Sequence, residues 1–85
     1  MARLQGRAAS VANAVTRYLA EHPRAADTRE GIRMWWIAAD IPDATPAEVD
    51  AALEHLVSEG MLERARLPNG DALFRAAAPP GADAA

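Results

Sequence analysis

The sequence predicts one small α+β domain, mainly helical, in which three short helices are followed by a β-hairpin. Apolar residues recur at helical spacing in three segments, and an Asn-Gly pair later separates two alternating segments. The 85 residues, 51% of them hydrophobic, are enough for one core and too few for two. We therefore expect an N-terminal arm (1–9), a single domain (10–77) and a disordered, proline-containing tail (78–85).

The first helix is predicted over residues 10–22. Val11, Val15 and Leu19 recur every four residues, which gives the segment one apolar face. The helix should end at Pro23, because proline disfavours helical backbone in the residue before it. The apolar face predicts that this helix packs against the core along most of its length.

The second helix is predicted to begin at residues 27–30. Asp27 is placed to cap it, with Glu30 three residues later in the reciprocal capping pattern. Four apolar residues then follow at the spacing i, i+3, i+4 and i+7, which is one broad helical face. They are Ile32, Trp35, Trp36 and Ala39. The spacing predicts that both tryptophans are in the core, and at least one of them in any case.

The third helix has the clearest local signal of the chain. Thr45 is a capping residue, Pro46 stands at the first helical position and Glu48 at the third, where its side chain can reach back to the cap. Gly60 is placed as the C-terminal cap. The predicted core stripe consists of Val49, Ala52, Leu53, Leu56 and Val57.

The hairpin is predicted from segments 61–67 and 72–76, with Asn69-Gly70 as its turn. A two-residue turn at this point pairs Arg64 with Arg75 and places Arg66 on the same, solvent-facing side. A cluster of guanidinium groups of this kind suits phosphate, which it can bind through paired hydrogen bonds. Residues Arg64, Arg66 and Arg75 are therefore the main candidate binding residues.

Three helices, a capped third helix ending in Leu56-Val57-Ser58-Glu59-Gly60-Met61-Leu62, and an Asn-Gly hairpin together resemble the winged helix-turn-helix family over residues 8 to 77. The resemblance implies that the hairpin is a wing lying along a DNA backbone and that the third helix enters the major groove. It implies base-facing residues Ala47, Asp50, Ala51, Glu54 and Ser58. Arg3 and Arg7 of the arm could add further backbone contacts.

The distribution of charge complicates this expectation. The stretch from residue 37 to residue 63 contains no arginine and carries seven carboxylates, and the chain has a net charge of −3. Carboxylates facing phosphates repel more than they recognise. Two hypotheses therefore stay open. The protein is a small transcriptional regulator that binds double-stranded DNA through its arginine-rich wing, or it is a protein-interaction module that docks through the acidic third helix or the tryptophan-containing second helix.

Other functions have little support in the sequence. There is no glycine-rich phosphate loop, no paired nucleophile and base, and no cluster of metal ligands, so we expect neither an enzyme nor a bound cofactor or metal. The absence of cysteine and of a long apolar run predicts a cytoplasmic protein that does not associate with membranes. A homodimer is a further expectation. Its candidate contacts are the segment around Leu4, Val11 and Val15 and a patch formed by Met34 and Ile37.

Overall fold

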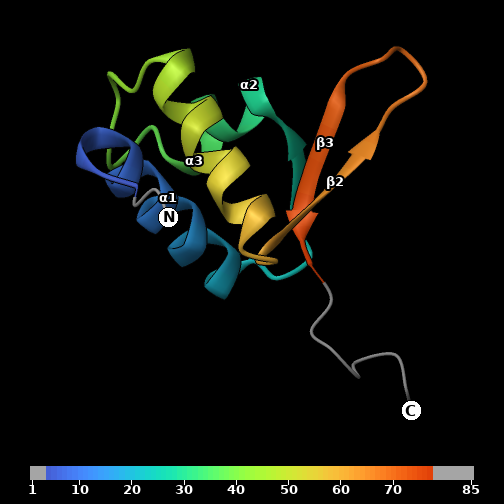
Figure 1. The fold of residues 1–85 in the computed structure, drawn as a ribbon, viewed down its shortest axis with the longest axis horizontal. Helices are drawn as coiled ribbons and strands as arrows, with labels where there is room; N and C mark the ends of the chain where they lie inside the picture. The colour runs from blue at the N-terminus through green and yellow to red at the C-terminus, as the bar shows by residue number, and fades with distance from the viewer. Residues whose placement is uncertain (1–3, 78–85) are drawn as a thin grey trace.

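The structure is a computed structural model that describes residues 4–77 (Figure 1). Arg3 and the expected tail (78–85) lie outside the described residues. Helix α1 (Gly6–Glu21) begins earlier than residue 10, so residues 6–9, expected in the arm, form its first turn. The expected boundary was wrong because it relied on the apolar face, whereas the alanines before that face are themselves strong helix formers.

The predicted apolar face of α1 is confirmed. Val11 and Val15 have no exposed surface, and Ala12 and Ala14 beside them are also buried. The helix ends just before Pro23, where the backbone N–H of His22 donates to the carbonyl of Tyr18 at 2.8 Å. The length of α1 and its buried face make it one wall of the core.

A short strand precedes the second helix and was not predicted. Strand β1 (Ala26–Thr28) leads directly into helix α2 (Arg29–Gly31). The capping residue is Thr28, whose hydroxyl accepts a hydrogen bond from the N–H of Gly31 at 3.2 Å. The prediction of Asp27 as the cap was wrong by one residue, because Asp27 belongs to the strand and its carboxylate accepts from the N–H of Thr28 at 2.8 Å.

The helical segment continues as a wider turn, η1 (Ile32–Trp36), with π-helical hydrogen bonding. The N–H of Ile37 donates to the carbonyl of Ile32 at 3.2 Å, five residues back rather than four. This turn rotates the following side chains away from the α-helical pattern. Trp36 and Ile37 are buried, Trp35 is 72% exposed and Ala39 is also exposed, so the predicted stripe is wrong at Trp35 and Ala39.

Helix α3 (Pro46–Ser58) forms as predicted, including both of its ends. The hydroxyl of Thr45 accepts from the N–H of Glu48 at 3.1 Å, and the Glu48 carboxylate accepts from the N–H of Thr45 at 2.9 Å. Gly60 has a φ of 78°, which lets the N–H of Met61 reach the carbonyl of Leu56 at 2.9 Å. The buried residues of its stripe are Val49, Ala52, Leu53 and Leu56.

The hairpin consists of β2 (Leu62–Arg66) and β3 (Ala72–Ala76), and β1 adds to the free edge of β3. The resulting antiparallel sheet has the order β1-β3-β2. The N–H of Leu67 donates to the carbonyl of Asp71 at 2.7 Å, which leaves Pro68, Asn69 and Gly70 as a three-residue loop. Gly70 has a φ of 94°, the left-handed conformation that such loops require at their last residue.

The loop length corrects the predicted register and the predicted grouping of arginines. Arg64 lies opposite Phe74, and Arg75 lies opposite Glu63, to which it is bonded at 2.7 Å. Because side chains alternate across a sheet, a shift of one residue moves a side chain to the other face. Arg64 and Arg66 therefore share the face of the sheet that carries the buried Phe74, and Arg75 lies on the opposite face.

The core lies between α1, α3 and this face of the sheet, where Leu53, Leu62 and Phe74 are all buried. The described chain is thus α+β, with its helices on one side of a small antiparallel sheet. In Figure 1 the tip of the hairpin projects well past the helices, so its outer half is not covered by them. No helix within residues 4–77 is long and apolar enough to span a membrane.

Candidate functional site

A hollow of about 470 Å³ lies beside the hairpin, and three arginines from two separate parts of the chain line it. Arg29 comes from the start of α2, and Arg64 and Arg66 come from β2. The remaining lining residues are Ala65, Gly70, Asp71 and Ala72. We refer to this feature as the arginine hollow. Because it brings three guanidinium groups together, it is the candidate site.

Arg64 is held in place from two sides. Its guanidinium carbon lies 5.7 Å from the centre of the Phe74 ring, and its Nη2 atom lies 2.6 Å from the Glu54 carboxylate of α3. A guanidinium over an aromatic face is stabilised by the charge distribution of the ring, and the planar group keeps a fixed orientation there. Phe74 is buried, so Arg64 has a rigid support at the edge of the hollow.

Arg29 and Arg66 differ in their partners. Arg29 makes two contacts with the carboxylate of Asp50 on α3, Nε to Oδ1 at 2.8 Å and Nη1 to Oδ2 at 3.4 Å. Arg66 makes no ion pair within residues 4–77. Asp71 also lines the hollow, where its carboxylate accepts a hydrogen bond from the Asn69 side chain at 3.2 Å. Arg66 is thus the arginine of the hollow that is most accessible to a bound anion.

The residues of α3 that were expected to face DNA bases differ in their exposure. Ala47, Ala51 and Glu54 are exposed, whereas Asp50 is partly buried. Asp50 and Glu54 are one helical turn apart and both pair with arginines of the hollow. The acidic surface expected on this helix is therefore engaged in part by the chain itself. Arg29 was not among the main candidate binding residues predicted from sequence, since nothing local connects the start of α2 with the hairpin.

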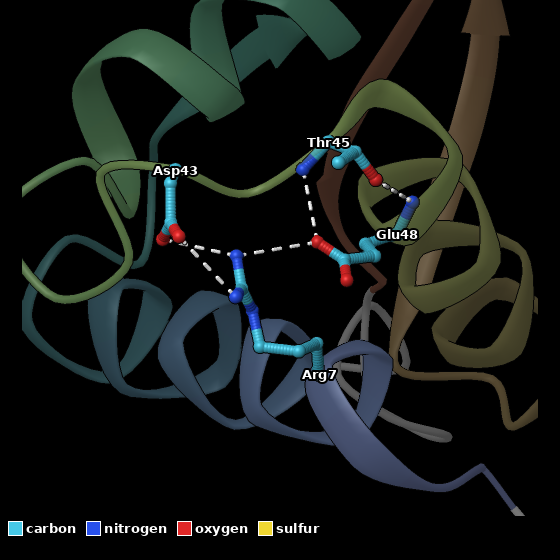
Figure 2. A network of polar contacts seen from close by, with 4 residues as sticks. All are labelled: Arg7, Asp43, Thr45 and Glu48. Carbon is cyan, nitrogen blue, oxygen red and sulfur yellow. Dashed lines mark hydrogen bonds and ion pairs between the residues drawn. The ribbon is translucent and has the colours of Figure 1, made fainter.

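Arg7 lies in an exposed network of polar contacts that includes the cap of α3 (Figure 2). Its guanidinium lies between two carboxylates, 3.0 Å from Asp43 and 3.4 Å from Glu48. Glu48 is also a member of the capping box of α3 with Thr45. We call these four residues the capping cluster. Arg7 thus lies in the capping cluster and not in the arginine hollow, and its predicted contact with DNA stays a prediction.

Two apolar side chains of η1 form an exposed patch. Trp35 is 72% exposed and its neighbour Met34 is 48% exposed, whereas Ile37 is fully buried. The patch expected from Met34 and Ile37 is therefore formed by Met34 and Trp35 instead. Of the other residues expected in a dimer contact, Val11 and Val15 are fully buried in the core and unavailable to a partner.

Within residues 4–77, the structure brings no three metal-ligating side chains together. Comparison of the chain with protein-family models, with curated proteins and with solved structures found no match. The class of protein is thus defined by the fold and the site alone: a small α+β domain that presents an arginine hollow beside a projecting hairpin.

Proposed function

We propose that the protein is a winged-helix DNA-binding protein that contacts the DNA backbone through the arginine hollow. The observation that carries this proposal is the convergence of Arg29, Arg64 and Arg66 on one open hollow. Guanidinium groups bind phosphate oxygens through charge-assisted, often paired hydrogen bonds. The order of elements also supports the proposal. The capped third helix is followed by a projecting hairpin, which is the layout that the winged-helix resemblance implies.

The charges of the hollow indicate the kind of binding to expect. Asp71 lines the hollow, and Asp50 and Glu54 pair with two of its arginines, so three carboxylates offset the three guanidinium charges. Contacts with the DNA backbone from a region whose charges are offset in this way give affinities near those of non-specific complexes, with dissociation constants of about 0.1 mM to 1 µM. We therefore propose backbone recognition, with a role in transcription regulation as the biological consequence, and assign no base-reading role to α3.

The test is fluorescence anisotropy with labelled mixed-sequence duplex DNA, with salt raised from about 50 to about 200 mM. We expect binding that weakens with salt, and a loss of about tenfold or more for Arg66→Ala, because a hydrogen bond to a charged group is removed. Arg24→Ala is the matched control, since Arg24 is exposed, lies outside the hollow and carries the same charge. Absence of binding at about 50 mM salt, or equal losses for the two variants, would refute the proposal.

A second candidate function, docking to another protein, is favoured by the patch of Met34 and Trp35. Exposed tryptophan is uncommon on monomeric surfaces and is enriched among the residues that dominate protein interfaces. Trp35 makes no contribution to the core, whereas its neighbour Trp36 stacks on Tyr18 with ring centres 4.7 Å apart. The two adjacent tryptophans therefore have separate roles, and the exposed one is free to anchor a partner.

This candidate can be tested by affinity capture from a lysate of the source cells with the protein and its Trp35→Ser variant. We expect at least one protein to be retained by the unmodified chain and lost with the variant. Met61→Ser is the control, because Met61 is also an exposed apolar side chain and belongs to a different surface. Identical sets of retained proteins in all three samples would count against docking through this patch.

A further inference from the structure

Two of the three guanidinium groups in the hollow are already bound by the chain itself. Asp50 contacts Arg29 through both of its carboxylate oxygens, and Glu54 contacts Arg64 at 2.6 Å. Carboxylate and phosphate present similar pairs of oxygen atoms to a guanidinium group. A carboxylate that is bound to a guanidinium group therefore competes with a phosphate for the same hydrogen-bond donors.

We propose that Asp50 and Glu54 act as internal competitors for DNA phosphates and hold the arginine hollow in an inhibited state. The inference rests on the proposed DNA binding and concerns its regulation. In this state Arg66 contacts a phosphate and the other two arginines do not. Neutralisation or displacement of the two carboxylates releases Arg29 and Arg64 for phosphate as well.

The positions of the two carboxylates suit this role. Asp50 and Glu54 are four residues apart on α3, so they lie on one face of the helix, one turn apart. Their partners come from α2 and β2, which are far apart in the sequence, so the fold brings each arginine to its own carboxylate. A single helix face therefore controls two of the three arginines.

The pairs are also weak enough to be exchanged. The side chains of Arg29, Asp50 and Glu54 are about half exposed or more, and that of Arg64 is 40% exposed. Ion pairs at such exposure stabilise a fold little, because water and salt screen them. Arg64 would keep its orientation after release, since the buried Phe74 ring supports it independently of Glu54.

The salt dependence of DNA binding measures the number of phosphates that the protein neutralises. For duplex DNA the slope of log affinity against log salt is about −0.9 per phosphate contact. The unmodified protein should therefore show a slope of about −0.9, and a protein with all three arginines released a slope of about −2.7. This difference is large enough to be resolved in a titration at four or five salt concentrations.

The experiment compares the unmodified chain with the double variant Asp50→Asn/Glu54→Gln, which keeps the shape of both side chains and removes their charge. The matched control is Glu21→Gln/Glu59→Gln, which changes the net charge equally. Glu21 and Glu59 are exposed and make no ion pair within residues 4–77. Circular dichroism establishes that each variant is folded, and the single variants Asp50→Asn and Glu54→Gln provide the same comparison if the double variant is not.

We expect the double variant to bind about tenfold more tightly at about 100 mM salt, with the steeper slope, and each single variant to add about one phosphate contact. The control should bind more tightly by a smaller factor and keep the slope of the unmodified chain. Equal slopes for the double variant and the control overturn the inference but leave DNA binding intact. No binding by any of the proteins overturns the inference and the proposed function together.

Discussion

Helix α3 carries two clusters of arginine and carboxylate side chains, and the clusters differ in what surrounds them. In the capping cluster at its start, one guanidinium lies between two carboxylates (Figure 2). One of these, Glu48, also accepts a backbone hydrogen bond that begins the helix. In the arginine hollow, Asp50 and Glu54 each pair with a single arginine, and the pairs border open space beside the hairpin.

The comparison shows that ion pairs alone do not distinguish a site from a structural network. The carboxylates of the capping cluster outnumber the guanidinium group, and one of them is needed for the fold. Of the three carboxylates at the hollow, Asp71 takes part in a turn, whereas Asp50 and Glu54 take part in no cap or turn within residues 4–77. One arginine of the hollow has no ion-pair partner within these residues. We therefore expect changes in the capping cluster to alter stability and changes in the hollow to alter binding.

The largest effect on stability is expected at Gly31, where the backbone of the helix that carries Arg29 packs against the Asp27 side chain. A Cβ atom at Gly31, two residues after Arg29, would overlap the Asp27 carboxylate. Gly31→Ala should lower the free energy of unfolding by about 1–3 kcal/mol, measured by urea unfolding, because the Asp27 side chain must move. With Asp27→Ala as the background, the same change should instead raise stability by up to about 1 kcal/mol, since alanine favours helix over glycine.

A destabilisation of equal size in both backgrounds would show that Asp27 is not the obstacle at Gly31. The two changes are in direct contact, so their effects should not add. The sign of the stability change that Gly31→Ala causes in each background is therefore more informative than its size. It tests whether β1 and the start of α2, which carry Arg29 to the hollow, are packed as the structure shows.

A smaller effect on stability is expected in the capping cluster. Thr45→Ala removes the hydroxyl that accepts the N–H of Glu48, and should lower the free energy of unfolding by about 1 kcal/mol. Thr16→Ala is the matched control, because the Thr16 hydroxyl donates to a carbonyl of its own helix at 2.9 Å and contributes little there. DNA affinity should be unchanged in both variants. Weaker DNA binding by folded Thr45→Ala would contradict the separation of the two clusters.

The helices α1 and α3 could be predicted from sequence because their signals are local. Apolar spacing defined both core faces, and the Thr45 to Glu48 pattern defined a start that the structure confirms. The second helix was predicted less well. Its π-helical turn exposes Trp35 and buries Ile37, and the apolar spacing alone assumes an α-helix throughout.

The candidate site depends on contacts that no local pattern records. The acidic stretch contains no arginine, yet the fold pairs its Asp50 with Arg29, 21 residues away, and its Glu54 with Arg64. The separation of charge in the sequence is therefore not a separation in space. The hairpin register was also wrong, because Asn69-Gly70 suits both a two-residue turn and the three-residue loop that begins with Pro68.

The smallest expected effect is that of Arg75→Ala, and it tests this register directly. Arg75 pairs with Glu63 on the face of the sheet opposite Arg64 and Arg66. Its pair is half exposed, so the change in stability should be within about 0.5 kcal/mol. DNA affinity measured by anisotropy should fall no more than for Arg24→Ala, because Arg75 does not line the hollow.

Suppose instead that Arg75→Ala weakens DNA binding as much as Arg66→Ala. The two arginines would then contact the same phosphates, which requires them to share one face of the sheet. That arrangement follows from a two-residue turn, which would place Arg64 opposite Arg75. A folded variant with unchanged DNA affinity, together with cross-strand NMR contacts between Arg64 and Phe74, would instead establish that one additional loop residue decides which arginines can reach DNA.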